Sequence, residues 1–240
     1  MRSKPNMEII LNELKNIRSE IGSLVNLFYK KGSNCSRSGK KYENEVYTII
    51  KNSPFVIEQV GGSSHAPDIK CVDDKSIEVK KAFAPDWGQT ILKWKNDNWF
   101  SNSELFNKYL NKLNMKCPPF LQNKMIYEEW LKIKSEYKDE YIDIDDNAIN
   151  EYYMKKGVCY IQISDGYGLY HLGDDVFNLG VPKFEIKQRM GVRVKVHSRS
   201  NNNGYAQLSV TGAFQPININ QLMKSPYSLD NMDKLPLNLL

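Results

Sequence analysis

Three short apolar runs between residues 55 and 83 constrain the fold of this 240-residue chain more than any other feature. The runs are FVIEQV at 55–60, DIKCV at 68–72 and SIEVKKAF at 76–83. Short runs of this kind, rich in β-branched and aromatic residues, are typical of strands. The segment Asp73–Lys75 between the last two runs has turn-forming residues, so we expect these runs to pair as an antiparallel hairpin.

Helical periodicity dominates the segments on either side of these runs. Apolar residues at three-and-four spacing predict helices over 6–30, 40–51, 101–113, 123–140 and 146–156. The sequence KGSNCSRSG at 31–39 should separate the first helix from the second. Ser101 and Glu104 have the spacing of a capping box, and Gly157 should end the last helix.

From Val158 onward the pattern returns to strands punctuated by Gly and Asn. The strand-like runs are VCYIQIS, GLYHLG, FEIKQRM, VRVKVHS and YAQLSVTGAF. We therefore predict an α/β fold, most simply as one compact domain. Its expected parts are an N-terminal helix (1–36), a segment with the central strands (37–100), a helical insertion (101–157) and a β-rich part (158–240).

Composition removes several classes of protein. The chain is 41% hydrophobic and 25% charged, which is ordinary for a globular protein. No apolar run approaches the roughly 20 residues of a membrane span, and the N-terminus has no signal-peptide pattern. We therefore expect an intracellular protein that does not associate with membranes. The four cysteines and three histidines are scattered, unlike those of a zinc or redox site.

The basic residues are unevenly distributed along the chain, whose net charge is +5. Residues 1–41 carry nine Lys or Arg against three Glu, and residues 183–199 carry six against one. Between them, residues 135–153 carry seven acidic side chains against one Lys. Two basic zones around a more acidic middle are compatible with a protein that binds phosphate groups.

Asp68, Glu78 and Lys80 form the arrangement that most suggests chemistry. Asp68 begins one predicted strand, whereas Glu78 and Lys80 lie two residues apart on the next and so share a face. The hairpin would bring two carboxylates and an ammonium together. Such ligands suit Mg²⁺, with Mn²⁺ able to substitute, and a bound ion can activate water against a phosphodiester. Lys80 would orient that water or neutralise charge on the phosphate.

The residues Pro67 and Asp68 followed by Glu78–Lys80 resemble the signature of the PD-(D/E)XK nuclease superfamily. This superfamily includes type II restriction endonucleases, Holliday-junction resolvases and mismatch-repair nickases. The segment GKKYE, residues 39–43, is similar to the glycine-x-x-x-glutamate segment that opens the first helix in many members. That similarity implies that Glu43 is a further metal-site carboxylate.

The loop GGSSHAPD, residues 61–68, is similar to the glycine-serine loop of resolvase-like members. Its small residues, including Ser63 and Ser64, would let a DNA backbone approach closely. The resemblance covers residues 38–83. It implies a restriction-endonuclease-like core, in which a central mixed sheet is flanked by helices, with the helical insertion and β-rich part completing a DNA cleft.

Further residues are candidates for DNA contact. Lys81 extends the strand of Lys80 onto the opposite face, and Gln89 lies where the superfamily's next helix often carries polar helpers. In residues 192–199, three valines alternate with basic side chains, which predicts a strand with an apolar face and a cationic one. The basic side chains are Arg193, Lys195, His197 and Arg199.

The resemblance implies a metal-dependent endonuclease that hydrolyses double-stranded DNA, most simply a site-specific enzyme of type II restriction kind working as a homodimer. A structure-specific junction resolvase or repair nickase is an alternative with the same chemistry. A third interpretation is a non-catalytic DNA-binding protein in which Asp68, Glu78 and Lys80 are together by coincidence.

Overall fold

The computed structural model describes residues 31–60 and 66–239, and for residues 31–37 it describes the backbone alone. The chain divides into two compact units, residues 1–42 and 43–240. Helix α2 (Lys31–Ile50) is continuous, so the expected break at 31–39 is wrong. Gly and Ser lower helix propensity by no more than about 1 kcal/mol each, which a long helix tolerates. The predicted helix at 6–30, together with Ser63 and Ser64, lies outside the described residues.

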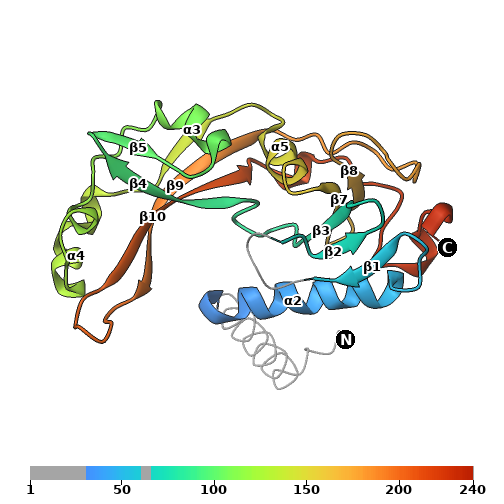
Figure 1. The fold of residues 1–240 in the computed structure, drawn as a ribbon, viewed down its shortest axis with the longest axis horizontal. Helices are drawn as coiled ribbons and strands as arrows, with labels where there is room; N and C mark the ends of the chain where they lie inside the picture. Colours follow the sequence, from blue (N-terminus) through green and yellow to red (C-terminus); the bar gives the residue numbers. More distant parts are fainter. Residues whose placement is uncertain (1–30, 61–65, 240) are drawn as a thin grey trace, which may run out of the picture. The chain divides into compact units, whose positions relative to one another are not determined.

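The first sheet of the larger unit is mixed. Its order is β1 (Val56–Gln59), β2 (Ile69–Cys71), β3 (Ser76–Lys80), β7 (Val158–Ile163) and β8 (Gly168–His171). Neighbours are antiparallel except β3 and β7, which run parallel (Figure 1). All three strands expected between residues 55 and 83 are confirmed, within a few residues at their ends.

The turn between β2 and β3 is also confirmed. Asp73 and Asp74 both have left-handed backbone conformations, with φ of 56° and 55°. Two successive left-handed residues make a type I′ turn, whose twist suits a two-residue hairpin. Aspartate tolerates this conformation better than most residues, which explains why the pair can occupy the turn without glycine.

The second sheet is wholly antiparallel. Its order is β5 (Asn98–Phe100), β4 (Gln89–Lys95), β10 (Gln207–Pro216), β9 (Gln188–Ser198) and β6 (Glu140–Asp143). The hairpin of β4 and β5 was not expected from the sequence. Its turn, Asn96 and Asp97, is left-handed like the β2–β3 turn. The two runs expected at 184–190 and 192–198 are instead parts of one long strand, β9, that begins at Gln188.

Three short helices follow β5 in the chain. They are α3 (Glu104–Leu110), α4 (Tyr127–Ile133) and α5 (Ala148–Met154). Single 3₁₀ turns lie at η1 (Pro119–Leu121), η2 (Lys134–Glu136), η3 (Ile219–Gln221), η4 (Met232–Lys234) and η5 (Leu237–Leu239). The end of α5 before Gly157, whose φ is +79°, confirms the expected stop.

Two helix predictions are wrong in detail. The residue before α3 is Ser103, not Ser101, whose hydroxyl lies 2.9 Å from Thr90 Oγ1 and so does not cap the helix. The helix expected over 123–140 is only α4, because the chain turns through η2 and then enters the second sheet as β6. Pairing with β9 therefore overrides the helical pattern near Glu140.

A single hydrophobic cluster joins both sheets to α3 and α5. Ile161 contributes from β7, Leu92 from β4, and Phe106 from α3 stacks on Phe214 of β10 with ring centroids 4.0 Å apart. The α/β class is therefore confirmed. Within the described residues, no helix is both long and apolar enough to cross a membrane.

Candidate active site

The β2–β3 register places Asp68 across from Glu78. Ile69 pairs with Ile77 and Lys70 with Ser76, so Asp68, one residue before β2, lies opposite Glu78. Residues directly opposite in a sheet share a face and have neighbouring side chains. Lys80, two residues beyond Glu78, lies on that same face. The sequence-predicted meeting of two carboxylates and an ammonium is therefore present in the fold.

Short contacts hold these three side chains together. Lys80 Nζ lies 2.6 Å from Glu78 Oε1. The backbone N–H of Val79 donates a hydrogen bond of 2.8 Å to Asp68 Oδ2, which fixes the Asp68 carboxylate beside the segment that carries both partners. The side chain of Glu78 is only 9% exposed and that of Lys80 23%. The cluster is thus largely shielded from water, where charge interactions are stronger.

Burial and like charge shift the ionisation of Asp68. Burial is the largest cause and the charge of Glu78 the next, and together they raise the pKa of Asp68 to about 7. Lys80 and the Val79 hydrogen bond act in the opposite direction, and Glu43 raises the pKa further. Two carboxylates held opposite each other in a sheet destabilise the fold unless something compensates them. Such strongly shifted groups are characteristic of functional sites.

Lys80 keeps its proton in this environment. Burial acts to lower the pKa of Lys80, but Tyr153, Glu78 and Asp68 outweigh it and hold the pKa well above its ordinary value. The ammonium lies 5.6 Å from the centre of the Tyr153 ring, which covers it from α5. Sequence reasoning missed Tyr153, because only the crossover that makes β7 parallel to β3 brings α5 over this strand.

The donor set fits a magnesium ion bound by two carboxylates. Within residues 31–60 and 66–239, no three His, Cys, Asp or Glu side chains gather as a ready-made metal site. Mg²⁺ needs only one or two carboxylates, because it keeps waters and takes substrate phosphate oxygens as its other ligands. The repulsion between Asp68 and Glu78 is what a divalent cation would relieve. Glu43 adds negative charge without completing a three-carboxylate cluster.

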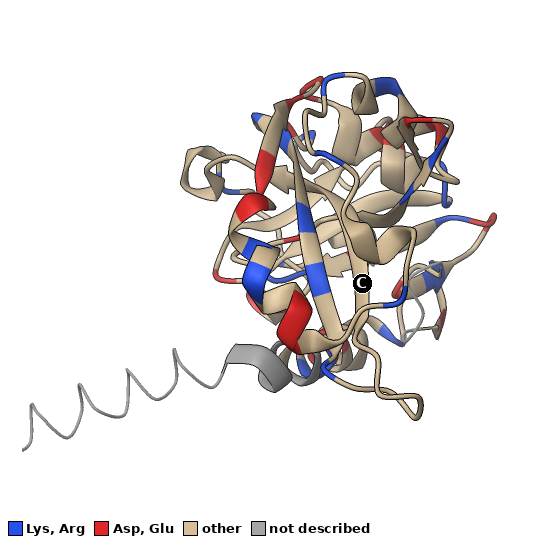
Figure 2. Cartoon of the chain, turned by 90° about the vertical axis from the view of Figure 1, so that its left-hand side faces the viewer, with Lys and Arg blue, Asp and Glu red and all other residues tan. Residues whose placement is uncertain are grey.

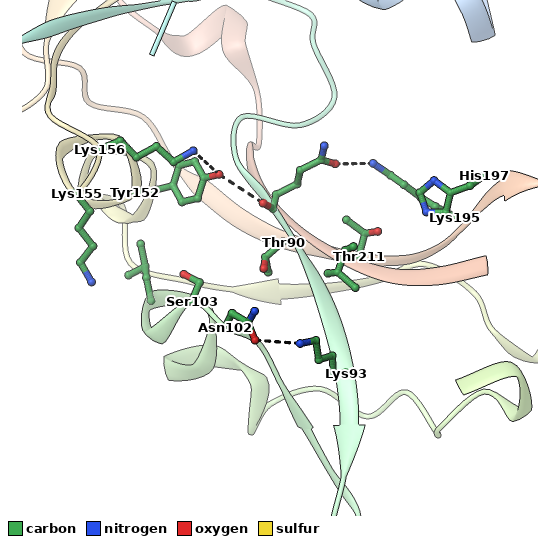
Figure 3. A pocket seen from close by; sticks show the side chains of 13 residues that line it. Thr90, Lys93, Asn102, Ser103, Tyr152, Lys155, Lys156, Lys195, His197 and Thr211 are labelled. Atoms are coloured by element: carbon green, nitrogen blue, oxygen red, sulfur yellow. Dashed lines mark hydrogen bonds between the residues drawn. The ribbon is translucent and has the colours of Figure 1, made fainter. Parts of the chain in front are cut away.

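Basic and acidic residues alternate with one another along the ribbon drawn in Figure 2. One pocket, of about 740 Å³, is lined by basic side chains and by no acidic ones among the described residues. It lies beside the second sheet (Figure 3). We call this the β4 pocket. Its lining comes from β4, α3 and the segment before it, α5 and the segment after it, β9 and β10. It consists of Gln89, Thr90, Ile91, Lys93, Asn102, Ser103, Leu105, Tyr152, Lys155, Lys156, Lys195, His197 and Thr211.

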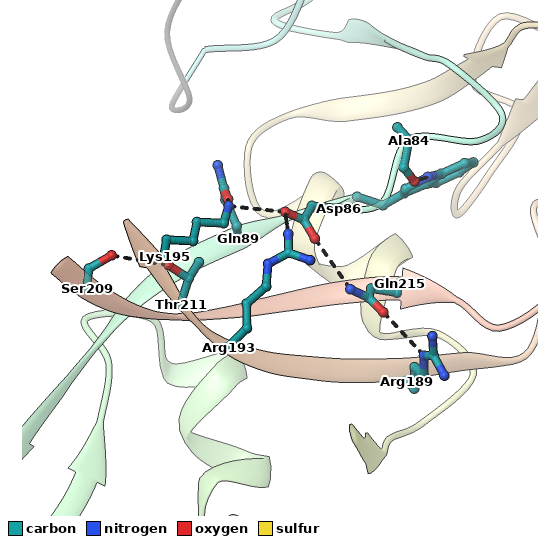
Figure 4. Close-up of polar contacts among 10 residues, drawn as sticks. Ala84, Asp86, Gln89, Arg189, Arg193, Lys195, Ser209, Thr211 and Gln215 are labelled. Atoms are coloured by element: carbon teal, nitrogen blue, oxygen red, sulfur yellow. Dashed lines mark hydrogen bonds and ion pairs between the residues drawn. The ribbon is translucent and has the colours of Figure 1, made fainter. Parts of the chain in front are cut away.

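The cationic face of β9 has an acidic partner that its own sequence does not show. Asp86, from the link between β3 and β4, contacts Arg193 Nη2 through Oδ2 and accepts a 3.2 Å hydrogen bond from Lys195 Nζ (Figure 4). Gln89 lies on β4, not on a helix as expected, and its Oε1 accepts a 2.6 Å hydrogen bond from Lys195. Asp86 therefore ties the link between β3 and β4 to β9 electrostatically.

The remaining predicted DNA contacts have other partners or are exposed. His197 Nε2 is 2.7 Å from Ser209 Oγ, and the Arg199 guanidinium lies over the Tyr127 ring at 5.2 Å. Lys81 is exposed immediately after β3. A role in DNA contact stays a prediction for these residues.

Comparison with protein-family models, with curated proteins and with solved structures returned no match.

Proposed function

We propose that this protein is a metal-dependent endonuclease acting on double-stranded DNA, with a restriction-endonuclease-like core. The observation that carries the proposal is the Asp68 carboxylate anchored by the Val79 amide beside the Glu78–Lys80 pair. The mixed sheet, with α2 before it in the chain and α5 before its parallel strand, supports the proposal. Type II restriction-like action by a homodimer is the form that the motif resemblance implies.

Each residue of the cluster has a distinct task in this proposal. Asp68 and Glu78 would hold Mg²⁺, or Mn²⁺ in its place, with Glu43 adding negative charge nearby. When bound, the ion supplies charge neutralisation at the phosphate and lowers the pKa of water. Lys80 stays protonated, so it can orient the attacking water or stabilise charge on the scissile phosphate. Tyr153 covers Lys80 and limits access of bulk water.

Plasmid cleavage tests the proposal directly. With Mg²⁺ the wild-type protein should nick or linearise plasmid DNA, and EDTA should abolish the reaction. Asp68→Asn and Lys80→Ala should each lower the rate by on the order of 100-fold or more, because each removes charge from the reacting centre. Glu58→Gln is the matched control, since Glu58 is an exposed carboxylate of the same sheet, on β1. Cleavage that survives both site substitutions would place the active site elsewhere.

Metal binding has a readout that does not need cleavage. Mg²⁺ should raise the Tm of the wild-type protein, because a ligand that binds only the folded state stabilises it. The shift should be lost in Asp68→Asn and kept in Glu58→Gln. Intact plasmid, no Mg²⁺-dependent Tm shift and unchanged DNA binding by Asp68→Asn would support a non-catalytic DNA-binding protein instead.

A structure-specific nuclease is the second candidate function. The GGSSHAPD loop favours it, because this loop is similar to the glycine-serine loop of resolvase-like members. A four-way junction and a linear duplex of the same sequence separate the two candidates. Preferential cutting of the junction would identify a resolvase-like enzyme, and discrete fragments with common end sequences would identify a site-specific one.

A further inference from the structure

The β4 pocket combines concentrated positive charge with the absence of acidic side chains from its lining, among the residues that the structure describes. The proposed nuclease chemistry does not use this pocket. Its basic side chains are Lys93, Lys155, Lys156, His197 and Lys195, the last of which also pairs with Asp86 outside the lining. Positive charge gathered in a concave surface raises the local concentration of anions. The pocket is therefore suited to an anionic ligand.

The basic groups approach the pocket from different elements. Figure 3 shows Lys155 and Lys156 on the side of α5, Lys195 and His197 across the pocket on β9, and Lys93 on β4. Several of them are oriented by neutral partners. Lys93 Nζ donates to Asn102 Oδ1 at 3.2 Å, and Lys156 Nζ donates to Tyr152 Oη at 2.8 Å. Because the Asn102 amide is neutral, it orients the Lys93 ammonium and leaves the charge of Lys93 available to a phosphate.

The pocket also offers apolar surface for a flat group. Ile91 is 57% exposed although it lies on a strand, and its side chain lines the pocket together with Leu105 and the Tyr152 ring. Thr90, Ser103 and Thr211 add hydroxyls that can donate or accept hydrogen bonds. Apolar walls with a few polar groups are typical of sites for small organic ligands. A nucleotide has both a phosphate, which the basic side chains can bind, and a flat base, which the apolar walls can contact.

Size restricts how a nucleic acid can use the pocket. Its volume of about 740 Å³ lies within the usual range for small-ligand sites, about 300–1,000 Å³. A space of this kind cannot admit a base-paired duplex, whereas one unpaired nucleotide can enter it. A flat basic patch would instead bind paired and unpaired strands through their phosphates alone.

We propose that the β4 pocket binds a single nucleotide that lies outside a base-paired helix. The proposal rests on the nuclease function insofar as that nucleotide belongs to the DNA strand bound as substrate. It adds to that function a subsite that favours an unpaired or extruded nucleotide over a fully paired one. A free nucleotide has the same chemistry, so the experiment includes an arm for it.

The test measures binding in EDTA, so that it does not depend on cleavage. Fluorescently labelled DNA is presented as a paired duplex and as the same duplex with one unpaired nucleotide. The wild-type protein should prefer the second. The double variant Lys93→Ala/Lys155→Ala should lose this preference, weaken binding by about tenfold or more and lower the log–log salt slope by about 2. Both lysines are exposed, so the variant should fold. Lys234→Ala, an exposed lysine outside the pocket, should bind as wild type.

Other results would overturn the proposal, change the ligand that it names, or refute the nuclease function. Equal weakening of both duplexes by the double variant would show only a basic surface, and no weakening would show no site. ATP binding that the double variant loses, while duplex binding and preference stay unchanged, would assign the pocket to free nucleotides. Plasmid cleavage without a pocket effect would refute this inference alone, whereas the preference without cleavage would refute the nuclease function alone.

Discussion

The two sheets hold their charged side chains in opposite ways. In the first sheet, Asp68 and Glu78 face each other with Lys80 as their cation, so negative charge is in excess. In the second, Arg193 and Lys195 share Asp86, so positive charge is in excess. An excess of buried carboxylate favours protons or metal ions, and an excess of cations favours phosphate. A nuclease needs carboxylates at the reacting bond and cations along the bound strand.

The largest expected effect comes from removing the cation of the first sheet. Lys80→Met should destabilise the protein by about 3–5 kcal/mol at pH 8, because it leaves buried Glu78 and Asp68 without their partner. Urea unfolding measures this change. Lys81→Met, next to it and exposed, should alter stability by less than about 0.5 kcal/mol. Similar losses for both variants would mean that the carboxylates do not depend on Lys80.

Removing the Asp68 carboxylate should raise the stability of the protein. In EDTA at pH 8, Asp68→Asn should stabilise the protein by about 2–4 kcal/mol, because the pKa of Asp68 rises from 3.8 to about 7 on folding. A raised pKa favours the folded protein below pH 3.8, and this stabilisation is lost as pH rises through about 7. The advantage of Asp68→Asn should therefore shrink toward pH 4. Thermal unfolding between pH 4 and 8 measures it, and a pH-independent gap would contradict the shift.

Asp86, the acid that pairs with the cations of the second sheet, should affect stability and DNA affinity with opposite signs. Asp86 has a side chain that is 14% exposed, so Asp86→Asn should cost about 1–3 kcal/mol through weakened bonds to Arg193 and Lys195. The same change frees positive charge and should tighten binding of labelled DNA at low salt. Asp233→Asn, at an exposed site, serves as the control. Weaker DNA binding by Asp86→Asn would separate this surface from phosphate recognition.

The smallest expected effect concerns the turns of the two tight hairpins, β2–β3 and β4–β5. Asp74 and Asp97 both have positive φ, 55° and 57°, in a conformation that glycine adopts without strain. Asp74→Gly and Asp97→Gly should each stabilise the protein by about 0.5 kcal/mol, since relief of strain is partly offset by the flexibility of glycine in the unfolded chain. Chemical unfolding of both variants measures the change. Destabilisation by either would show that the aspartate side chain itself supports its turn.

Local patterns predicted the β2–β3 hairpin well and the β4–β5 hairpin not at all. Asp73 and Asp74 separate two runs of recognisable strand residues, so both the turn and the register of Asp68 against Glu78 follow from neighbours in the chain. The segment that becomes β4 was expected to lead into a helix. Besides β5, β4 pairs with β10, more than 100 residues away, and no pattern near β4 in the sequence indicates this second partner.

The sequence by itself determined the hairpin, the shared face of Glu78 and Lys80 and the position of Asp68 opposite them, because strand alternation and a two-residue turn act over a few residues. Tertiary structure alone decided that Tyr153 covers Lys80, that Asp86 reaches across to Arg193 and Lys195, and that the β4 pocket exists. Each of these depends on pairing or packing between segments far apart in the chain, whose relative placement is set by burial of the shared core.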